Sequence, residues 1–268
     1  MRTPSLSELL DQVKLPGICL PSFGDLGEAF DDLFPNVEET TRLEALSFHG
    51  LLSAHNATTV LDCTCGTGLQ VIGLAKLGYD TAASDLSSRM LSVLRQKEQE
   101  LGLHIDTKRA DVRTLHPWQG RQFEAVISGG NSLAVLSTRA DLVKSFHAMR
   151  SVATTGGLIL VGGRDYGIAK TADEAIVPRY FRLNAGEPEW LLDLRLFGAE
   201  RVRVINVFLR ASQGRWRLKT FLKSYMYISA YLIADLMGEV GLTNVRLYDQ
   251  TALHPYDGQP WYIVSGDC

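Results

Sequence analysis

The sequence contains little cysteine, no long apolar run and no excess of basic residues. Its four cysteines, Cys19, Cys63, Cys65 and Cys268, form no CxxC pair, and no HxxxH complements them, so we expect no metal site. No stretch approaches the roughly 18 uninterrupted apolar residues of a membrane span. The formal net charge of −3 speaks against a nucleic-acid partner, since a groove for phosphates needs clustered Lys and Arg.

The beginning of the chain also lacks the apolar run of a signal peptide. Glu8, Asp11 and Lys14 interrupt it, so we expect a cytoplasmic protein. Ser5 and Glu8 form a capping box, and an apolar stripe follows at helical spacing, which predicts a short helix. The stripe consists of Leu6, Leu9, Leu10 and Val13.

Strands and helices alternate from Thr58 onward, after a helix predicted from Asn36 to about Ala54. Strands are predicted near 59–61, 80–84, 104–110, 123–128 and 157–162, and helices near 69–77, 87–100 and 139–150. This alternation indicates a parallel sheet covered on both faces, a doubly wound α/β fold.

The pattern changes after Arg164. Residues 189–198, 201–211 and 215–227 are β-rich, which predicts an antiparallel meander inserted into the main domain. A helix at 229–240 and strands at 243–249 and 261–265 follow, and we expect them to end the main sheet with an antiparallel strand.

The segment from Val60 to Gly68 reads VLDCTCGTG, a buried strand that enters a glycine turn and then a helix. Such turns let backbone approach a ligand, although they also serve plain structure. Val71 stands where a dinucleotide motif would have its third small residue. A carboxylate at Asp62 suits a cationic ligand such as the amino and sulfonium groups of S-adenosylmethionine.

Two further acids end predicted strands. Asp85 lies 17 residues after Gly68, where it can accept both ribose hydroxyl hydrogens, or favour the dipole of the following helix. Asp111 can accept from an adenine amino group while Val112 packs on the ring, or it can be a surface acid of a loop.

With these motifs in place, the sequence resembles class I S-adenosylmethionine-dependent methyltransferases over residues 35–165. VLDCTCGTG, SDLSSRML, FEAVISGGNSLAVL, GGLILVGGRDY and PYDGQPWYIV together resemble glycine N-methyltransferase and its bacterial glycine/sarcosine relatives. This resemblance implies a seven-stranded, Rossmann-like sheet. It also implies four parts: an N-terminal helix and lid segment at 1–34, a cofactor core at 35–165, a substrate insert at 166–227, and C-terminal elements at 228–268.

The resemblance implies roles for individual residues. Asn131 would lie beside the acceptor amine, Arg164 would clamp the substrate carboxylate, and Tyr225 would line the pocket. The family has an arginine that binds the carboxylate of the cofactor. Arg42 is the corresponding residue here, displaced by two positions from the family's arginine. The cofactor-binding set comprises Arg42, Asp62, Thr64, Gly66, Gly68, Asp85, Leu86, Met90, Asp111, Val112, Gly129, Gly130 and Ser132.

Three positions depart from the family. Phe23, Leu33 and Asn206 stand where the family has pocket tyrosines, so we expect an acceptor larger than glycine, or core packing in the case of Phe23 and Leu33. Arg164 also has a case of its own, because a guanidinium at a strand end grips a carboxylate bidentately. Its structural alternative is a salt bridge with Asp165.

We therefore expect an N-methyltransferase acting on a small amine, amino-acid-like or heterocyclic, with S-adenosyl-L-homocysteine as the product. The alternatives are an O-methyltransferase, for which His147 and His254 are candidate bases, and a non-catalytic cofactor-binding regulator. The partners expected are a small-molecule substrate, no nucleic acid and no membrane. The family's oligomers suggest self-association, with the apolar stripe either a contact between copies or packing on its own domain.

Overall fold

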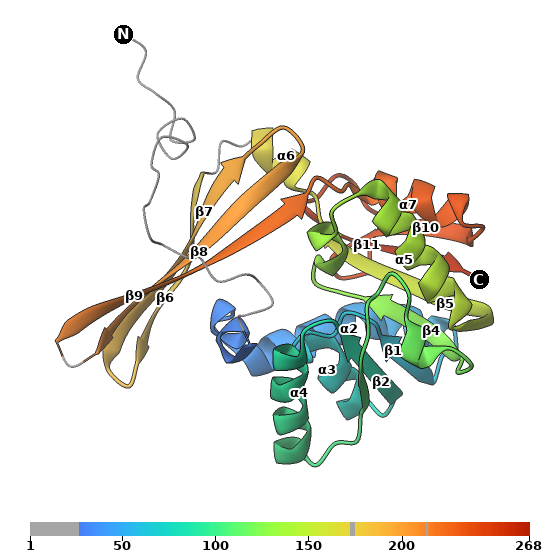
Figure 1. Cartoon of the computed structure of the whole chain (residues 1–268), viewed down its shortest axis with the longest axis horizontal. Helices are drawn as coiled ribbons and strands as arrows, with labels where there is room; N and C mark the ends of the chain where they lie inside the picture. Colours follow the sequence, from blue (N-terminus) through green and yellow to red (C-terminus); the bar gives the residue numbers. More distant parts are fainter. Residues whose placement is uncertain (1–26, 172–174, 213) are drawn as a thin grey trace, which may run out of the picture.

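The computed structural model describes residues 27–171, 175–212 and 214–268, which form a main α/β body and a projecting antiparallel sheet (Figure 1). The helix predicted at the beginning of the chain, Cys19 and Phe23 lie outside the described residues.

The main sheet has seven strands in the order β10-β11-β5-β4-β1-β2-β3. The strand β11 is antiparallel to both of its neighbours, and the other pairs are parallel. This confirms the predicted doubly wound α/β fold with an antiparallel last strand. The strands are β1 (Thr59–Asp62), β2 (Asp80–Asp85), β3 (Asp106–Arg109), β4 (Phe123–Ser128), β5 (Ala153–Arg164), β10 (Thr243–Asp249) and β11 (Trp261–Asp267).

Side chains that accept hydrogen bonds from backbone amides cap three of the helices, at the places where the sequence predicted these helices to begin. Asn36 accepts from the amide of Glu39, Ser87 from that of Met90, and Ser229 from that of Leu232. Across the described ranges, no helix has the length and apolar character to cross a membrane. The body helices are α2 (Val37–Ala54), α3 (Leu69–Lys76), α4 (Ser88–Leu101), α5 (Arg139–Ser151) and α7 (Ala230–Glu239), with short 3-10 turns η3 (His116–Trp118) and η4 (Ser132–Val135).

Both faces of the main sheet are buried, which explains why its strands are apolar runs without alternation. Adjacent residues of β4 illustrate this. Val126 belongs to the apolar cluster that contains Phe146 of α5 and Leu236 of α7. Ile127 belongs to the cluster that contains Phe48 of α2.

The insert follows β5 and the short helix α6 (Tyr166–Thr171). Its strands β6 (Ile176–Asn184), β7 (Glu187–Phe197), β8 (Arg201–Ser212) and β9 (Arg215–Met226) pair consecutively and antiparallel. The predicted meander is confirmed, but the sequence did not predict β6. Pro178 and an irregular register at 178–180 disguise that strand, and proline is tolerated there because β6 is an edge strand.

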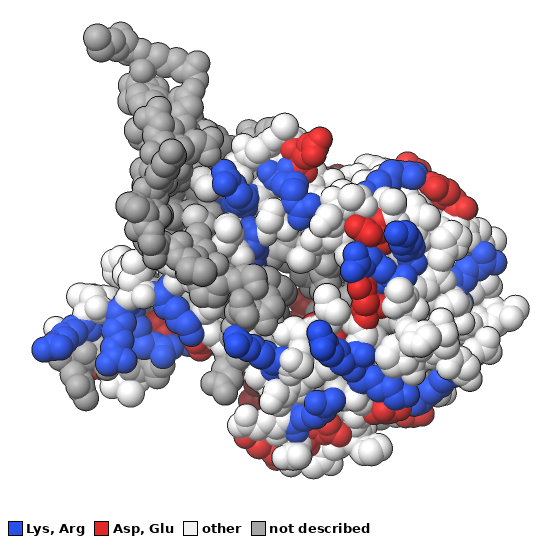
Figure 2. All heavy atoms as spheres, in the orientation of Figure 1, with Lys and Arg blue, Asp and Glu red and all other residues white. Residues whose placement is uncertain are grey.

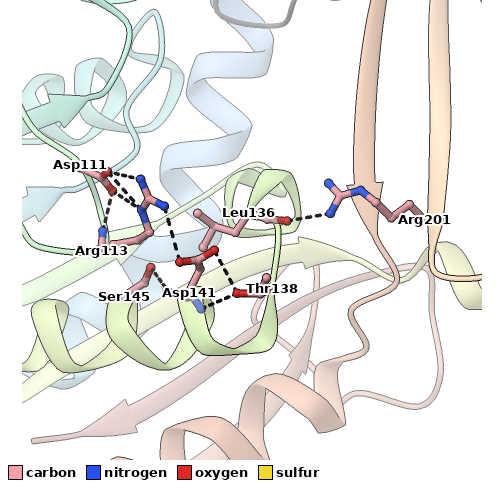
Figure 3. A network of polar contacts seen from close by, with 7 residues as sticks. All are labelled: Asp111, Arg113, Leu136, Thr138, Asp141, Ser145 and Arg201. Carbon is pink, nitrogen blue, oxygen red and sulfur yellow. Dashed lines mark hydrogen bonds and ion pairs between the residues drawn. The ribbon is translucent and has the colours of Figure 1, made fainter.

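Polar contacts at two places join the insert to the rest of the molecule. At its base, Arg201 donates to the carbonyl of Leu136 at 2.9 Å (Figure 3). Farther out, buried Glu189 accepts from Tyr180, Arg182 and Arg210 at 2.6–2.9 Å. Tyr180 also donates to the carbonyl of Asp32 in the 3-10 turn η2 (Gly27–Leu33), and Arg182 to that of Pro35 just after it, which holds the turn against the insert.

Candidate active site

The glycine turn after β1 needs glycine for two reasons. Gly66 and Gly68 have φ angles of 53° and 97°, a region that L side chains rarely adopt. A Cβ on Gly68 would also lie 2.5 Å from Cδ1 of Leu94 on α4. The turn therefore packs closely on α4 while Gly66 keeps its backbone beside a cavity described below.

Asp85, at the end of β2, faces this turn. Its Oδ2 accepts from the amide of Gly66 at 3.0 Å, and its Oδ1 accepts from the amide of Ser87 at 2.8 Å. Burial raises the pKa of the carboxyl, although both amide hydrogen bonds oppose that shift. Asp85 thus takes the position at the second strand end that the sequence predicted.

The turn after β4 forms a second wall. Gly130 and Asn131 both have positive φ angles, of 66° and 80°. A Cβ on Gly129 would lie 2.7 Å from Nε2 of Gln70 on α3, so a larger residue there would require that side chain to move. Asn131 is buried, and its Oδ1 accepts from the backbone amide of Arg164 at 3.0 Å, which ties the ends of β4 and β5 together.

Arg164 ends β5 between two aromatic rings. Its guanidinium carbon lies 5.0 Å from the centroid of Tyr166 and 5.3 Å from that of Trp261. Its buried Nε has no hydrogen-bond partner. Among the described residues no carboxylate makes an ion pair with it, and Asp165 instead accepts from the amide of Gly167. The structure therefore gives no support to a salt bridge between Arg164 and Asp165.

The inner face of the insert supplies the opposite wall. Tyr225 of β9 is buried and stacks on Tyr166 with ring centroids 5.3 Å apart. Burial raises the pKa of Tyr225, so its hydroxyl stays protonated at neutral pH. Burial lowers the pKa of Lys223 to about 7, with Asp193 opposing that shift.

These walls enclose a cavity of about 850 Å³. This volume lies in the upper part of the usual range for ligand sites. The cavity brings together many of the predicted site residues from the ends of β1, β2, β4, β5 and the insert. They are Thr64, Gly66, Asp85, Gly129, Gly130, Asn131, Ser132, Arg164 and Tyr225.

Other predicted residues do not line the cavity. Arg42 is exposed on α2 and pairs with Glu39 of the same helix at 2.7 Å. Asp111 is held by Arg113, two residues further on, through hydrogen bonds of 2.6–3.1 Å (Figure 3). The Arg113 guanidinium lowers the pKa of that carboxyl. Both charges are engaged locally in this structure, and their roles toward the cofactor stay predictions.

The remaining predicted residues are structural neighbours of the site in this geometry. Gly68 and Asp62 are not among the residues that line the cavity, and Asp62 is fully buried and accepts from the amide of Thr64 at 3.2 Å. Met90 packs in the apolar cluster below η2, Val112 packs against the main core, and Leu86 is exposed. Cys63 and Cys65 are buried, as expected for small side chains at a strand end.

Sequence reasoning missed several cavity residues. Glu44 of α2 accepts from Gln70 at 2.9 Å, and burial raises the pKa of the Glu44 carboxyl. Asp193 and Lys223 lie on the insert. The sequence contains a pattern that could have identified Asp193 and Lys223. Each is a charged residue at a strand position whose side chain, by the alternation along the strand, faces the buried side of the sheet.

The comparisons with known proteins agree with this geometry. Residues 60–157 match a family model described as a methyltransferase domain. A glycine/sarcosine N-methyltransferase of Aphanothece halophytica is 27% identical over 242 residues, which cover 88% of this chain and 85% of that protein. Another, from Parasynechococcus marenigrum, is 32% identical over 119 residues, which cover 44% of this chain and 42% of that protein.

Among solved structures, a methyltransferase from Streptomyces caelestis superimposes with a TM-score of 0.77 at 18% identity, covering 91% of this chain and 97% of that one. The fold, the glycine turn and the matching domain define a class I S-adenosylmethionine-dependent methyltransferase. Within that class the chain resembles the glycine/sarcosine N-methyltransferase branch, which confirms the predicted resemblance.

Proposed function

We propose that this methyltransferase acts on the nitrogen of a small amine that carries a carboxylate. The observation that carries the proposal is Arg164, a cation at the wall of the cavity with an unpaired, buried Nε. A guanidinium at a cavity wall that makes no ion pair with a carboxylate of the described residues can bind the carboxylate of a ligand. A relative named for methylating glycine and sarcosine, both amines with a carboxylate, supports the same class of acceptor.

The residues present fit S-adenosylmethionine at the strand ends of the main sheet. Gly66 has open space where a side chain would stand, and Asp85, which accepts from its amide, stands beside it as an acceptor for hydroxyl groups. We propose that Thr64, Gly66, Asp85, Gly129, Gly130 and Ser132 hold the cofactor, which supplies an electrophilic methyl group on a sulfonium. Residues 35–165 would then form the cofactor part and 166–227 the substrate part, completed by 1–34 and 228–268.

The task of the protein is to hold a neutral amine in line with that methyl group, since orientation lowers the barrier to displacement. Arg164 would fix the carboxylate end of the acceptor. Asn131, held by its bond to the amide of Arg164, would orient the amine hydrogens so that the lone pair faces the methyl. Tyr225, stacked on Tyr166, would close the pocket against water. No general base is needed when the amine binds in its neutral form.

The second candidate function is O-methylation. The predicted bases His147 and His254 are exposed and do not line the cavity. His49, which the sequence did not single out, does line it, with Nδ1 at 2.8 Å from the hydroxyl of Tyr79. A histidine at the cavity keeps this second candidate in the test below.

The test is methyl transfer from labelled S-adenosylmethionine to a panel of amino acids, carboxylate-free amines, nitrogen heterocycles and phenols. The proposal expects labelled products from amines that carry a carboxylate, with the label on nitrogen by mass spectrometry and NMR, and little product from the carboxylate-free acceptors. Label on the oxygen of an acceptor, formed by the wild type but not by His49→Gln, would establish O-methylation instead. Binding of S-adenosylmethionine without transfer to any acceptor would favour a regulatory protein. A cytosolic location and self-association belong to the same proposal and rest on the sequence.

A further inference from the structure

Asn206 is a buried polar residue on an otherwise apolar stretch of the insert. It lies on β8 with 2% of its surface exposed, and it lines the cavity. Val204 and Phe208 flank it on the same face of the strand, and its cross-strand neighbours are Asp193 and Phe221.

The orientation of the amide is determined by its partner. Nδ2 donates to Oδ1 of Asp193 at 2.6 Å, and the other carboxylate oxygen of Asp193 accepts from Arg179 at 3.1 Å. Because a carboxylate only accepts, the amide nitrogen must face Asp193. The amide oxygen is therefore directed away from Asp193, and this buried Oδ1 has no hydrogen-bond partner.

Two residues that line the same cavity thus each carry a buried polar atom without a partner, and the two atoms are of opposite character. Nε of Arg164 lacks an acceptor, and Oδ1 of Asn206 lacks a donor. Buried polar atoms without partners are rare in native proteins, because each loses the hydrogen bonds that it makes with water. Arg164 belongs to the main sheet and Asn206 to the insert, so one ligand that satisfies both must present an acid group and a separate hydrogen-bond donor.

We propose that Asn206, held in place by Asp193, is a specificity-determining residue that accepts a hydrogen bond from a hydroxyl or N–H group in the side chain of the methyl acceptor. This inference rests on the proposed function and narrows it. The acceptor is an amine with a carboxylate at one end and a polar, donor-bearing substituent at the other. It also explains why the expected acceptor differs from glycine, which has no such substituent.

The experiment compares acceptors that differ only in the donor: serine with 2-aminobutyrate, and homoserine with norvaline. Rates are measured with S-adenosylmethionine, and binding is measured by calorimetry on enzyme saturated with S-adenosylhomocysteine. We expect the hydroxylated member of at least one pair to be favoured about tenfold to a hundredfold in kcat/KM or in affinity, since a site that keeps an unpaired acceptor rejects the apolar analogue.

Asn206→Leu removes the acceptor at similar volume and should abolish this preference, leaving S-adenosylhomocysteine binding intact. Val207→Thr, on the opposite face of the same strand, is the matched control and should keep the preference. If Asn206→Leu does not fold, Asn206→Ala, which also has no acceptor in its side chain, provides the same comparison.

The outcomes separate this inference from the proposed function. Transfer to amines without any preference within the pairs would overturn the role of Asn206 and leave N-methylation standing. Preferential binding of the hydroxylated members without transfer would support Asn206 and overturn N-methylation of these amines. Equal or absent binding of both members in every pair would overturn the role of Asn206.

Discussion

Asp85 carries much of the argument for the cofactor end of the cavity. It joins the glycine turn to the end of β2 through Gly66, and it caps the next turn through Ser87. Its carboxylate therefore has a structural role and a proposed role in ligand binding. A suitable substitution changes the second role and leaves the first one intact. Asparagine keeps the shape of the side chain and one acceptor oxygen, but removes the charge.

For Asp85→Asn we expect affinity for S-adenosylmethionine to fall about tenfold or more, because charge-assisted hydrogen bonds to ribose hydroxyls are lost. Calorimetry measures the affinity, and thermal unfolding checks that the fold survives. Asp80→Asn, at the exposed start of the same strand, is the control and should bind as the wild type does. Unchanged affinity in Asp85→Asn would remove this residue from the site.

Asp62 makes a prediction about pH. Burial raises the pKa of this carboxyl to about 8, and its Oδ2 has no partner. In the unfolded chain the same group titrates near a pKa of about 3.9. Between these values the folded state binds one more proton than the unfolded state, so this residue's contribution to stability falls as pH rises.

We therefore expect the free energy of unfolding of the wild type to fall relative to that of Asp62→Asn between about pH 4 and pH 8. The slope should reach up to about 1.4 kcal/mol per pH unit. Urea unfolding of both proteins across this range measures it. A difference between the two proteins that does not change with pH would show that Asp62 is ionised in the folded state.

At the scale of elements, the turn from β1 into α3 depends on close contact with α4. Gly68 and Gly78 flank α3, and both have positive φ angles, of 97° and 93°. They differ in their surroundings. A Cβ on Gly68 would meet Leu94 and Ile72 within 3 Å, whereas a Cβ on Gly78 would have nothing within 4 Å.

Gly78→Ala should therefore cost only the backbone strain of about 1–2 kcal/mol. Gly68→Ala should cost about 1–3 kcal/mol more, because the added methyl group overpacks the contact with α4. Chemical denaturation of the two variants measures this difference directly. Equal losses would mean that α4 shifts freely, and the turn would then not be held in one position.

The elements also show what the sequence predicted and what it did not. The starts of α2, α4 and α7 were predicted because Asn36, Ser87 and Ser229 cap them locally. The edge strand β6 was missed because Pro178 interrupts its pattern. The local pairing of Arg42 with Glu39 and of Asp111 with Arg113 was not predicted, because a motif does not reveal such competition.

At the scale of the whole molecule, residues of two distinct sheets, the main sheet and that of the insert, line the cavity. The main sheet supplies Asp85 and Arg164, and the insert supplies Asn206 and Tyr225. The sequence predicted both sheets, because each has its own pattern of alternation. How the insert's polar face meets the strand ends depends on tertiary contacts such as that of Arg201 with Leu136, and this was not predictable.

The outer end of the insert differs from this inner face. Figure 2 shows basic side chains on the part that projects from the body, where the paired ends of β8 and β9 carry Arg210, Arg215 and Arg217. Charged groups there stay in water and keep a protruding sheet soluble. The inner face, by contrast, is the part of the insert that we assign to the acceptor.

The most direct test of the account is the dependence of carboxylate recognition on Arg164. The measurement is kcat/KM for the best amino-acid acceptor and for its carboxamide, in the wild type and in Arg164→Lys. Lysine keeps the charge but loses the planar fork that grips a carboxylate. Arg139→Lys, on the exposed surface of α5, serves as the control.

The account predicts that the wild type prefers the carboxylate acceptor by about tenfold or more, and that Arg164→Lys loses most of this preference. S-adenosylhomocysteine should bind the variant as it binds the wild type, and the carboxamide should lose little. Turnover of the carboxylate acceptor by Arg164→Lys at the wild-type rate would contradict the carboxylate clamp, and with it the proposed class of substrate.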